Sequence, residues 1–173
     1  MNMDILFESH YYQGGRTLCR LFKEGNQDAI KTMAVAMSRL VPPGVVLVPI
    51  PSRYGYATDT LTLASEIAKL AKVPVADILK GYCRQSNYFA KKEGHPLSID
   101  DLGFHKTGNT DLTPCFIDNV YDTGVTMQSA YKAFGKGIAE IDNTMAIAMF
   151  NLSDKPQKLG FIPLKLGLTE DQT

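Results

Sequence analysis

The residues best suited to chemistry follow the apolar run Cys115-Phe116-Ile117. A polar pair, Asp118-Asn119, ends this run, and a short turn, Asp122-Thr123-Gly124-Val125-Thr126, then leads into a predicted helix. The first amide groups of a helix, together with its dipole, favour an anion such as phosphate. The glycine lets the backbone approach such a ligand closely, and the two threonine hydroxyls supply further donors. The pattern therefore predicts a phosphate site, and it differs from the P-loop and the dinucleotide-binding loop, whose glycine signatures occur nowhere in the chain.

The elements that must position this turn form an alternating pattern. Helices are predicted over 28–40, 60–71 and 127–134, and strands over 45–48, 116–118 and 144–150, with a short strand ending near residue 79. Strands that alternate with helices indicate an α/β domain with a central, mainly parallel sheet flanked by helices. Ligands of such sheets lie at the carboxyl ends of the strands. The polar segments after Val48 and after Ile117 both fall at such ends, so we expect a site there.

Length and charge are those of one globular domain without a strong electrostatic field. The chain has 173 residues, with 18 basic and 18 acidic side chains. We therefore expect a single domain over residues 1–173, no membrane partner, no strong attraction to nucleic acid, and an anion site that is local. The N-terminal residues lack the plan of a signal peptide, and the three cysteines have no metal-binding spacing. Reduced thiols in a cytoplasmic protein are the expectation.

The segment 81–113 differs from the rest of the chain. It is long and charged, and it shows little periodicity. A connection of this length in a compact domain is usually a functional lid, a disordered segment or a hairpin, and the residues alone leave these alternatives open. The tail after Ser153 is expected to hold a short strand and then to fray.

The segment Cys115–Thr126 resembles the phosphoribosyl-pyrophosphate (PRPP) motif of the type I phosphoribosyltransferases. The family pattern has a few apolar residues, two acidic residues, two variable positions and a Thr-Gly-x-Thr-like turn. The resemblance implies that Asp118 and Asn119 hold the ribose hydroxyls and that the turn from Asp122 to Thr126 holds the 5′-phosphate. Asn119 stands where the family has an acidic residue, and its amide can bond a hydroxyl but carries no negative charge.

A second resemblance covers more of the chain. The stretch Leu18–Gly25, followed by a helix and by Pro49-Ile50-Pro51-Ser52-Arg53, is similar to the competence-protein F group of phosphoribosyltransferases. This similarity implies that Ser52 and Arg53 bind pyrophosphate. The residue types agree, because prolines stiffen a turn and an arginine offers a fork of donors suited to phosphate. A rigid loop with a solvated arginine is the alternative.

Three residues are candidates for catalysis. Asp122 stands where phosphoribosyltransferases acting on 6-oxopurines carry an aspartate, so the resemblance implies acid/base action on the purine ring. A helix N-cap is the other role for this residue. Lys91 and Lys92 lie in the 81–113 segment, which the resemblance makes a lid, and one of them is implied to neutralise the departing pyrophosphate. An ordinary solvated charge cluster that also includes Arg84 is the alternative.

The function implied by the resemblance is transfer of the 5-phosphoribosyl group from PRPP to a nitrogenous base, with release of pyrophosphate. Asp122 favours a 6-oxopurine as the base. Mg²⁺ would be bound through PRPP, without a metal site made by the protein alone, and the family commonly forms homodimers. The alternative is a catalytically weak or inactive module of the same fold that binds PRPP or a nucleotide in a regulatory or DNA-uptake-related role.

Replacing Asn119 by Asp tests the assignment of the ribose-binding pair. The substitution restores the negative charge of the family pattern, so it should tighten binding of PRPP, because a charged acceptor makes the stronger bond to a hydroxyl. Calorimetric titration of both proteins with PRPP measures the difference. An unchanged affinity would show that residue 119 does not face the ribose.

Overall fold

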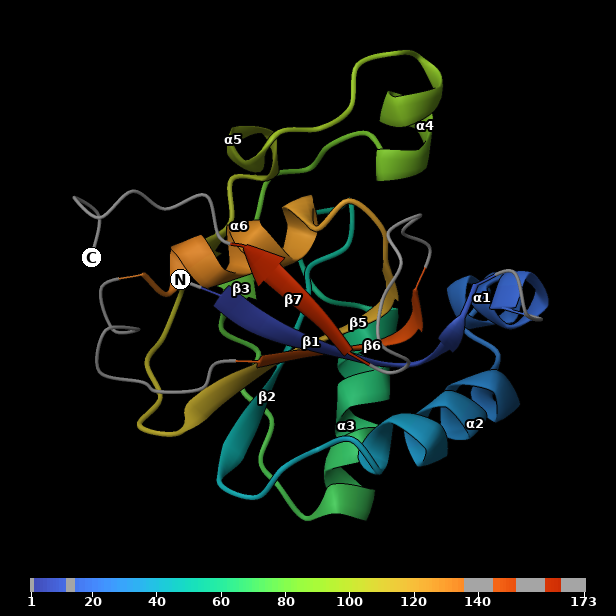
Figure 1. The fold of residues 1–173 in the computed structure, drawn as a ribbon, viewed down its shortest axis with the longest axis vertical. Coiled ribbons are helices and arrows are strands. Elements are labelled where there is room, and N and C mark those ends of the chain that lie inside the picture. Colours follow the sequence, from blue (N-terminus) through green and yellow to red (C-terminus); the bar gives the residue numbers. More distant parts are fainter. Residues whose placement is uncertain (1, 12–14, 136–144, 152–160, 166–173) are drawn as a thin grey trace.

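The computed structural model describes residues 2–11, 15–135, 145–151 and 161–165. Its centre is a five-stranded sheet (Figure 1). In sheet order the strands are β2 (Val45–Pro49), β5 (Thr113–Tyr121), β6 (Met145–Asn151), β1 (Asn2–His10) and β7 (Phe161–Lys165). The first four strands are parallel, and β7 is antiparallel to β1. The predicted α/β fold, with a mainly parallel sheet flanked by helices, is therefore confirmed.

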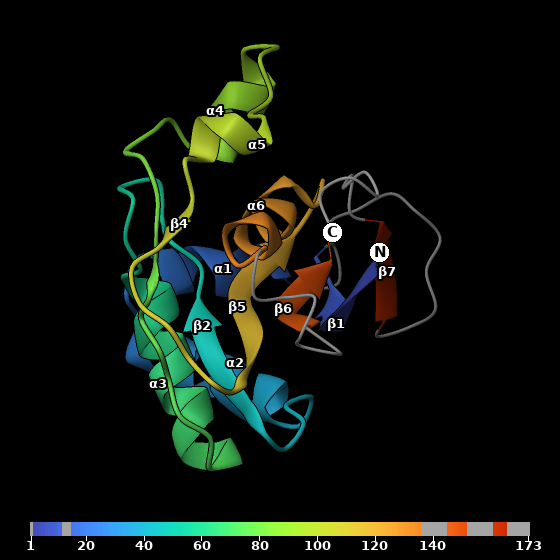
Figure 2. The same ribbon diagram turned by 90° about the vertical axis from the view of Figure 1, so that its left-hand side faces the viewer.

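Helices cover both faces of the sheet, as the side view shows (Figure 2). One face carries α1 (Gly15–Lys23), α2 (Gln27–Ser38) and α3 (Asp59–Ala71), and the other carries α6 (Val125–Ala133). Val45 and Leu47 of β2 pack with the first group, whereas Val46 and Val48 pack with α6. All four valine and leucine side chains are buried. The unbroken apolar run in the sequence follows from this, because a strand covered on both faces has no solvent side.

The direction of the chain connections reverses between β2 and β5. After β2 the chain passes through α3 and returns beside β2, where Val75 forms a parallel bridge with Leu47. After β5 it passes through α6 and returns on the opposite side as β6. Such a reversal is a topological switch point, and ligands of open α/β sheets bind there, at the carboxyl ends of the strands.

A long excursion separates β3 (Leu79–Lys80) from β4 (His105–Lys106), which pair antiparallel with each other. We call residues 81–104 the arm; it contains α4 (Asn87–Lys92) and α5 (Ile99–Leu102) and extends beyond the sheet (Figure 1). The predicted 81–113 segment is thus closed at its base by a short hairpin ladder and built from two short helices. Lys132 Nζ of α6 lies 3.9 Å from Asp100 Oδ1 of α5, so the arm contacts the helix that follows the turn at residues 122–126.

The base of the arm is bonded to the loop that follows β2. The Gly81 N–H donates to the Gly55 carbonyl at 2.8 Å, and the Arg84 N–H donates to the Arg53 carbonyl at 2.7 Å. Gly55 has a φ of +92°, and a Cβ atom at this position would collide with the carbonyl oxygen of Gly81. Glycine is therefore required here both for the backbone angle and for the close approach of the two segments.

Most predicted elements lie within a few residues of their observed limits. Strand β5 is an exception, since it continues past the predicted end at Asp118 to Tyr121. The reason is that β6 pairs with β5 along this stretch, so backbone hydrogen bonds carry the polar pair into the strand. Strand β1 and helix α1 were not predicted. Strand β7 matches the short strand predicted after Ser153, and the residues predicted to fray after it lie outside the described part of the chain.

Replacing Gly55 by Ala should destabilise the protein more than replacing Gly44 by Ala. Gly44 has a similar φ of +79°, but a Cβ at this position would have no atom within 4 Å. Gly44→Ala should therefore lose only about 1–2 kcal/mol for the left-handed backbone. Gly55→Ala should lose about 1–3 kcal/mol more from overlap with the arm. Urea denaturation measures both free energies of unfolding, and equal losses would contradict a tight contact between loop and arm.

Candidate functional site

The carboxyl ends of β2 and β5 bring two predicted site segments together. Pro49 lies opposite Ile117 in the parallel ladder, and the Ile50 N–H donates to the Ile117 carbonyl at 3.0 Å. The loop after β2 therefore begins beside Asp118. The Pro-x-Pro loop and the Asp118–Thr126 segment, far apart in the sequence, lie side by side at the switch point of the sheet.

Internal hydrogen bonds hold the loop after β2 in a tight turn. The Ser52 N–H and Ser52 Oγ both donate to the Tyr56 carbonyl, at 2.9 and 3.0 Å. Thr60, buried at the start of α3, donates through Oγ1 to the Ile50 carbonyl at 2.6 Å. Arg53 is exposed, and its Nη2 donates to a neighbouring tyrosine hydroxyl at 2.8 Å. Arg53 is thus accessible at the strand end, whereas the Ser52 hydroxyl is engaged within its own loop.

The turn before α6 has the strand–turn–helix form predicted for a phosphate site. Gly124 is the N-cap residue of α6, is buried and has a φ of 89°. Thr123 Oγ1 accepts the N–H of Val125 at 3.4 Å, and Thr126 lies in the first turn of the helix. Asp122 precedes the N-cap by two residues, so the alternative that Asp122 caps the helix is wrong. The first turn of α6 begins at the switch point, where its dipole favours an anion.

Asp118 has an unusual electrostatic environment within the site. Burial raises the pKa of Asp118 to about 7, although the N–H of Asn119 and the positive charges of Arg84 and Lys23 act in the opposite direction. The Asn119 N–H lies 2.8 Å from Asp118 Oδ1. A carboxyl group with such a pKa changes its charge near neutral pH. It can accept bonds from hydroxyl groups as a carboxylate, or share a proton with a ligand.

Lys91 and Asp122, two of the three predicted catalytic residues, form an ion pair. Lys91 Nζ of α4 lies 3.1 Å from Asp122 Oδ2, which joins the arm to the turn before α6. The Lys91 and Asp122 side chains are 60% and 34% exposed, so water screens the pair and its contribution to stability is small. Lys92 is also exposed on α4. The structure thus distinguishes two neighbouring lysines that the sequence treats alike.

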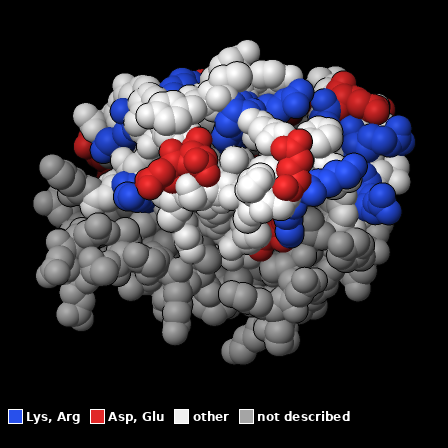
Figure 3. Space-filling view, turned by 90° about the horizontal axis from the view of Figure 1, so that it is seen from above, with Lys and Arg blue, Asp and Glu red and all other residues white. Residues whose placement is uncertain are grey.

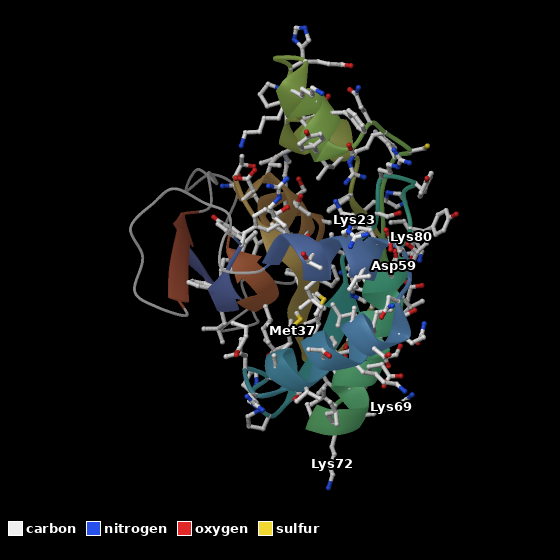
Figure 4. All side chains as sticks on the ribbon, turned by 90° about the vertical axis from the view of Figure 1, so that its right-hand side faces the viewer. Lys23, Met37, Asp59, Lys69, Lys72 and Lys80 are labelled. Atoms are coloured by element: carbon white, nitrogen blue, oxygen red, sulfur yellow. The ribbon has the colours of Figure 1, made fainter. Side chains whose placement is uncertain are left out.

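Two basic residues approach Asp118 that the sequence reasoning left without a clear role. Lys23, the last residue of α1, lies at the same end of the molecule as Asp59 at the start of α3 (Figure 4). Arg84, in the arm, donates from Nη1 to the Ser52 carbonyl at 2.9 Å. The sequence offers only weak indications of a role for these two residues. Lys23 precedes Glu24-Gly25, and Arg84 is the single arginine of the arm. Only the folded chain brings both charges to one carboxyl group.

The surface on the arm side carries a mixed charge. Viewed from above, Lys and Arg side chains gather there, with acidic groups between them (Figure 3). In the described ranges, no group of three or more His, Cys, Asp or Glu side chains is arranged to hold a metal ion, and no helix is long and apolar enough to cross a bilayer. The three cysteines are free thiols, of which Cys19 and Cys115 are buried and Cys83 is exposed.

Comparison with known proteins finds similarity at the level of structure. No family profile matches the sequence, and no curated protein matches it. Adenine phosphoribosyl transferase from Trypanosoma brucei, solved with AMP, pyrophosphate and ribose-5-phosphate, is similar over 78% of this chain and 72% of its own, with 14% identity and a TM-score of 0.42. Purine phosphoribosyltransferase from Pyrococcus horikoshii Ot3 is similar over 90% of this chain and 98% of its own, with 14% identity and a TM-score of 0.32. The finer resemblance to the competence-protein F group receives no support from these comparisons.

Replacing Lys91 by Met should loosen α4 and lower global stability only slightly. The pair is exposed, so its loss should lower the free energy of unfolding by less than about 1 kcal/mol. Amide hydrogen exchange in residues 87–92 should become faster by up to about fivefold, as expected for the loss of one weak interaction. Lys92→Met is the matched control and should leave exchange unchanged. Equal effects of the two variants would mean that the Lys91–Asp122 pair does not hold the arm.

Proposed function

We propose that this protein is a phosphoribosyltransferase that transfers the 5-phosphoribosyl group from PRPP to a nitrogenous base and releases pyrophosphate. The observation that carries the proposal is the meeting of two segments at one switch point. One is the Asp118–Thr126 segment, with its PRPP-type residue pattern on a strand, a glycine turn and a helix start. The other is the Pro49–Arg53 loop, which starts opposite Ile117.

Each segment has chemistry suited to one part of PRPP. Asp118 and Asn119 would bond the ribose hydroxyls, and the turn from Asp122 to Thr126 would bind the 5′-phosphate with backbone amides and hydroxyls. Arg53, with Ser52 through its backbone or a rearranged hydroxyl, would meet the pyrophosphate. In the reaction, the bond between C1 of the ribose and the pyrophosphate oxygen breaks, and a nitrogen of the base bonds to C1. Catalysis would then rest on positioning and on stabilising the charge that develops as pyrophosphate leaves.

Mg²⁺ fits this site as an ion that enters with PRPP. The carboxyl of Asp118 and the amide of Asn119 are oxygen donors, which Mg²⁺ prefers, and they would hold the ion jointly with the ribose hydroxyls and the pyrophosphate. When bound, the ion supplies positive charge that offsets the charge of the departing pyrophosphate.

The Lys91–Asp122 ion pair relates the proposed roles of these two residues to each other. Asp122 is within hydrogen-bond distance of Lys91 in this arrangement. If Asp122 exchanges a proton with a purine ring, Lys91 must leave it, and its ammonium group then becomes available to the pyrophosphate. Lys91 is therefore preferred over Lys92 as the lid residue, and a 6-oxopurine is preferred as the base.

Asn119 favours a second candidate function, a module that binds PRPP or a nucleotide without turning it over. An amide at this position lacks the charge of a carboxylate and would hold the ribose and the ion less strongly. The module and the enzyme share the same contacts to PRPP, and they differ only in whether pyrophosphate is released.

The proposal is tested by incubating the protein with PRPP, Mg²⁺ and a panel of purine and pyrimidine bases. Release of pyrophosphate with one base, with 6-oxopurines expected first, supports the enzyme. Binding of PRPP in calorimetry without release of pyrophosphate supports the module. Absence of both binding and release would overturn the proposed function.

A paired substitution tests the phosphate turn specifically. Thr123→Val removes a hydroxyl next to the helix start and should weaken PRPP about three- to tenfold, the usual effect of losing one hydrogen bond. Thr32→Val, on α2, keeps a β-branched side chain and removes a hydroxyl that bonds only the Asp28 carbonyl among the contacts described. It should leave PRPP affinity unchanged.

A further inference from the structure

Arg84 connects the arm, the loop after β2 and the centre of the site. Its backbone N–H donates to the Arg53 carbonyl at 2.7 Å, and its Nη1 donates to the Ser52 carbonyl at 2.9 Å, across 32 residues of sequence. Its guanidinium carbon lies 5.6 Å from the ring centroid of Phe104 at the end of the arm. One half-buried side chain therefore touches two segments that enter the site from different strands.

The charge of Arg84 also acts on Asp118. Burial lowers the pKa of the Arg84 guanidinium, and the nearby Asp118 opposes this shift. In return, Arg84 lowers the pKa of Asp118, which burial raises.

The Nε atom of Arg84 is buried and has no hydrogen-bond partner among the described residues. The planar guanidinium group points its donors in fixed directions, which a lysine cannot reproduce. Nη1 of the side chain and the N–H of the backbone both donate to the loop after β2, so Arg84 holds that loop.

We propose that Arg84 is a positioning residue that holds the Ser52–Gly55 turn against the arm, so that the loop after β2 stays beside the Asp118–Thr126 segment. The identity of the ligand as PRPP rests on the proposed function. The effect on the turn belongs to the free protein and does not depend on it.

Two substitutions test the role of Arg84. Arg84→Lys keeps the positive charge but loses the planar fork, whereas Arg84→Met keeps the aliphatic bulk and loses both. Lys69→Met is the control, because Lys69 is exposed and lies toward the end of α3 remote from Asp59 (Figure 4). Circular dichroism establishes that each variant is folded.

The first measurement is amide hydrogen exchange of residues 50–58 in the free protein. Exchange should be about three- to tenfold faster in both Arg84 variants and unchanged in Lys69→Met, since each Arg84 variant loses the bond to the Ser52 carbonyl.

The second measurement is titration with PRPP and Mg²⁺, in which Arg84→Met should bind about three- to tenfold more weakly, as when one supporting hydrogen bond is lost. Unchanged exchange in Arg84→Met would overturn the proposal, and a lower PRPP affinity with unchanged exchange would mean that Arg84 contacts the ligand directly. If the wild-type protein does not bind PRPP, the proposed function fails, while the exchange measurement still decides the role of Arg84. If Arg84→Met does not fold, Arg84→Lys decides it through the same exchange measurement.

Discussion

The parallel pairing of β2 with β5 is the constraint on which the site depends. The register that sets Pro49 opposite Ile117 also sets the start of the Pro-x-Pro loop beside Asp118. This register is strongly specified, because the side chains from Val45 to Val48 are buried on both faces of the sheet. A shift by one residue would move each of these side chains to the core on the opposite face. The apolar packing of the strands therefore determines where the polar residues at their ends meet.

The arm is attached to this arrangement through backbone contacts as well as side chains. Gly55 lets the loop after β2 approach the backbone of Gly81 so closely that no side chain fits between them. Arg84 and Lys91 then bring positive charge from the arm to Asp118 and Asp122. The candidate site thus combines the strand ends with an arm that is held by backbone hydrogen bonds, by the half-buried Arg84 and by exposed ion pairs. In the proposed function, the Lys91–Asp122 pair is the contact that a bound ligand replaces.

The sequence predicted the elements whose patterns are strong and missed those whose patterns are weak. Helix α3 and strand β2 have clear periodicity and a clear apolar run, and both lie close to their predicted limits. Strand β1 was missed because a short N-terminal stretch offers few signals, although it lies between β6 and β7 in the sheet. The limits of β5 were too narrow because pairing with β6 continues through polar residues, which a reading based on apolar runs cannot detect.

The sequence by itself determined the α/β alternation and the strand–turn–helix form of the Asp118–Thr126 segment, because these are local and depend on residue type and spacing. The tertiary structure alone decided which charges meet. It paired Lys91, and not Lys92, with Asp122, and it brought Arg84 and Lys23 to Asp118. Such contacts join elements distant in the sequence, and they depend on sheet order and strand register, which no local pattern contains.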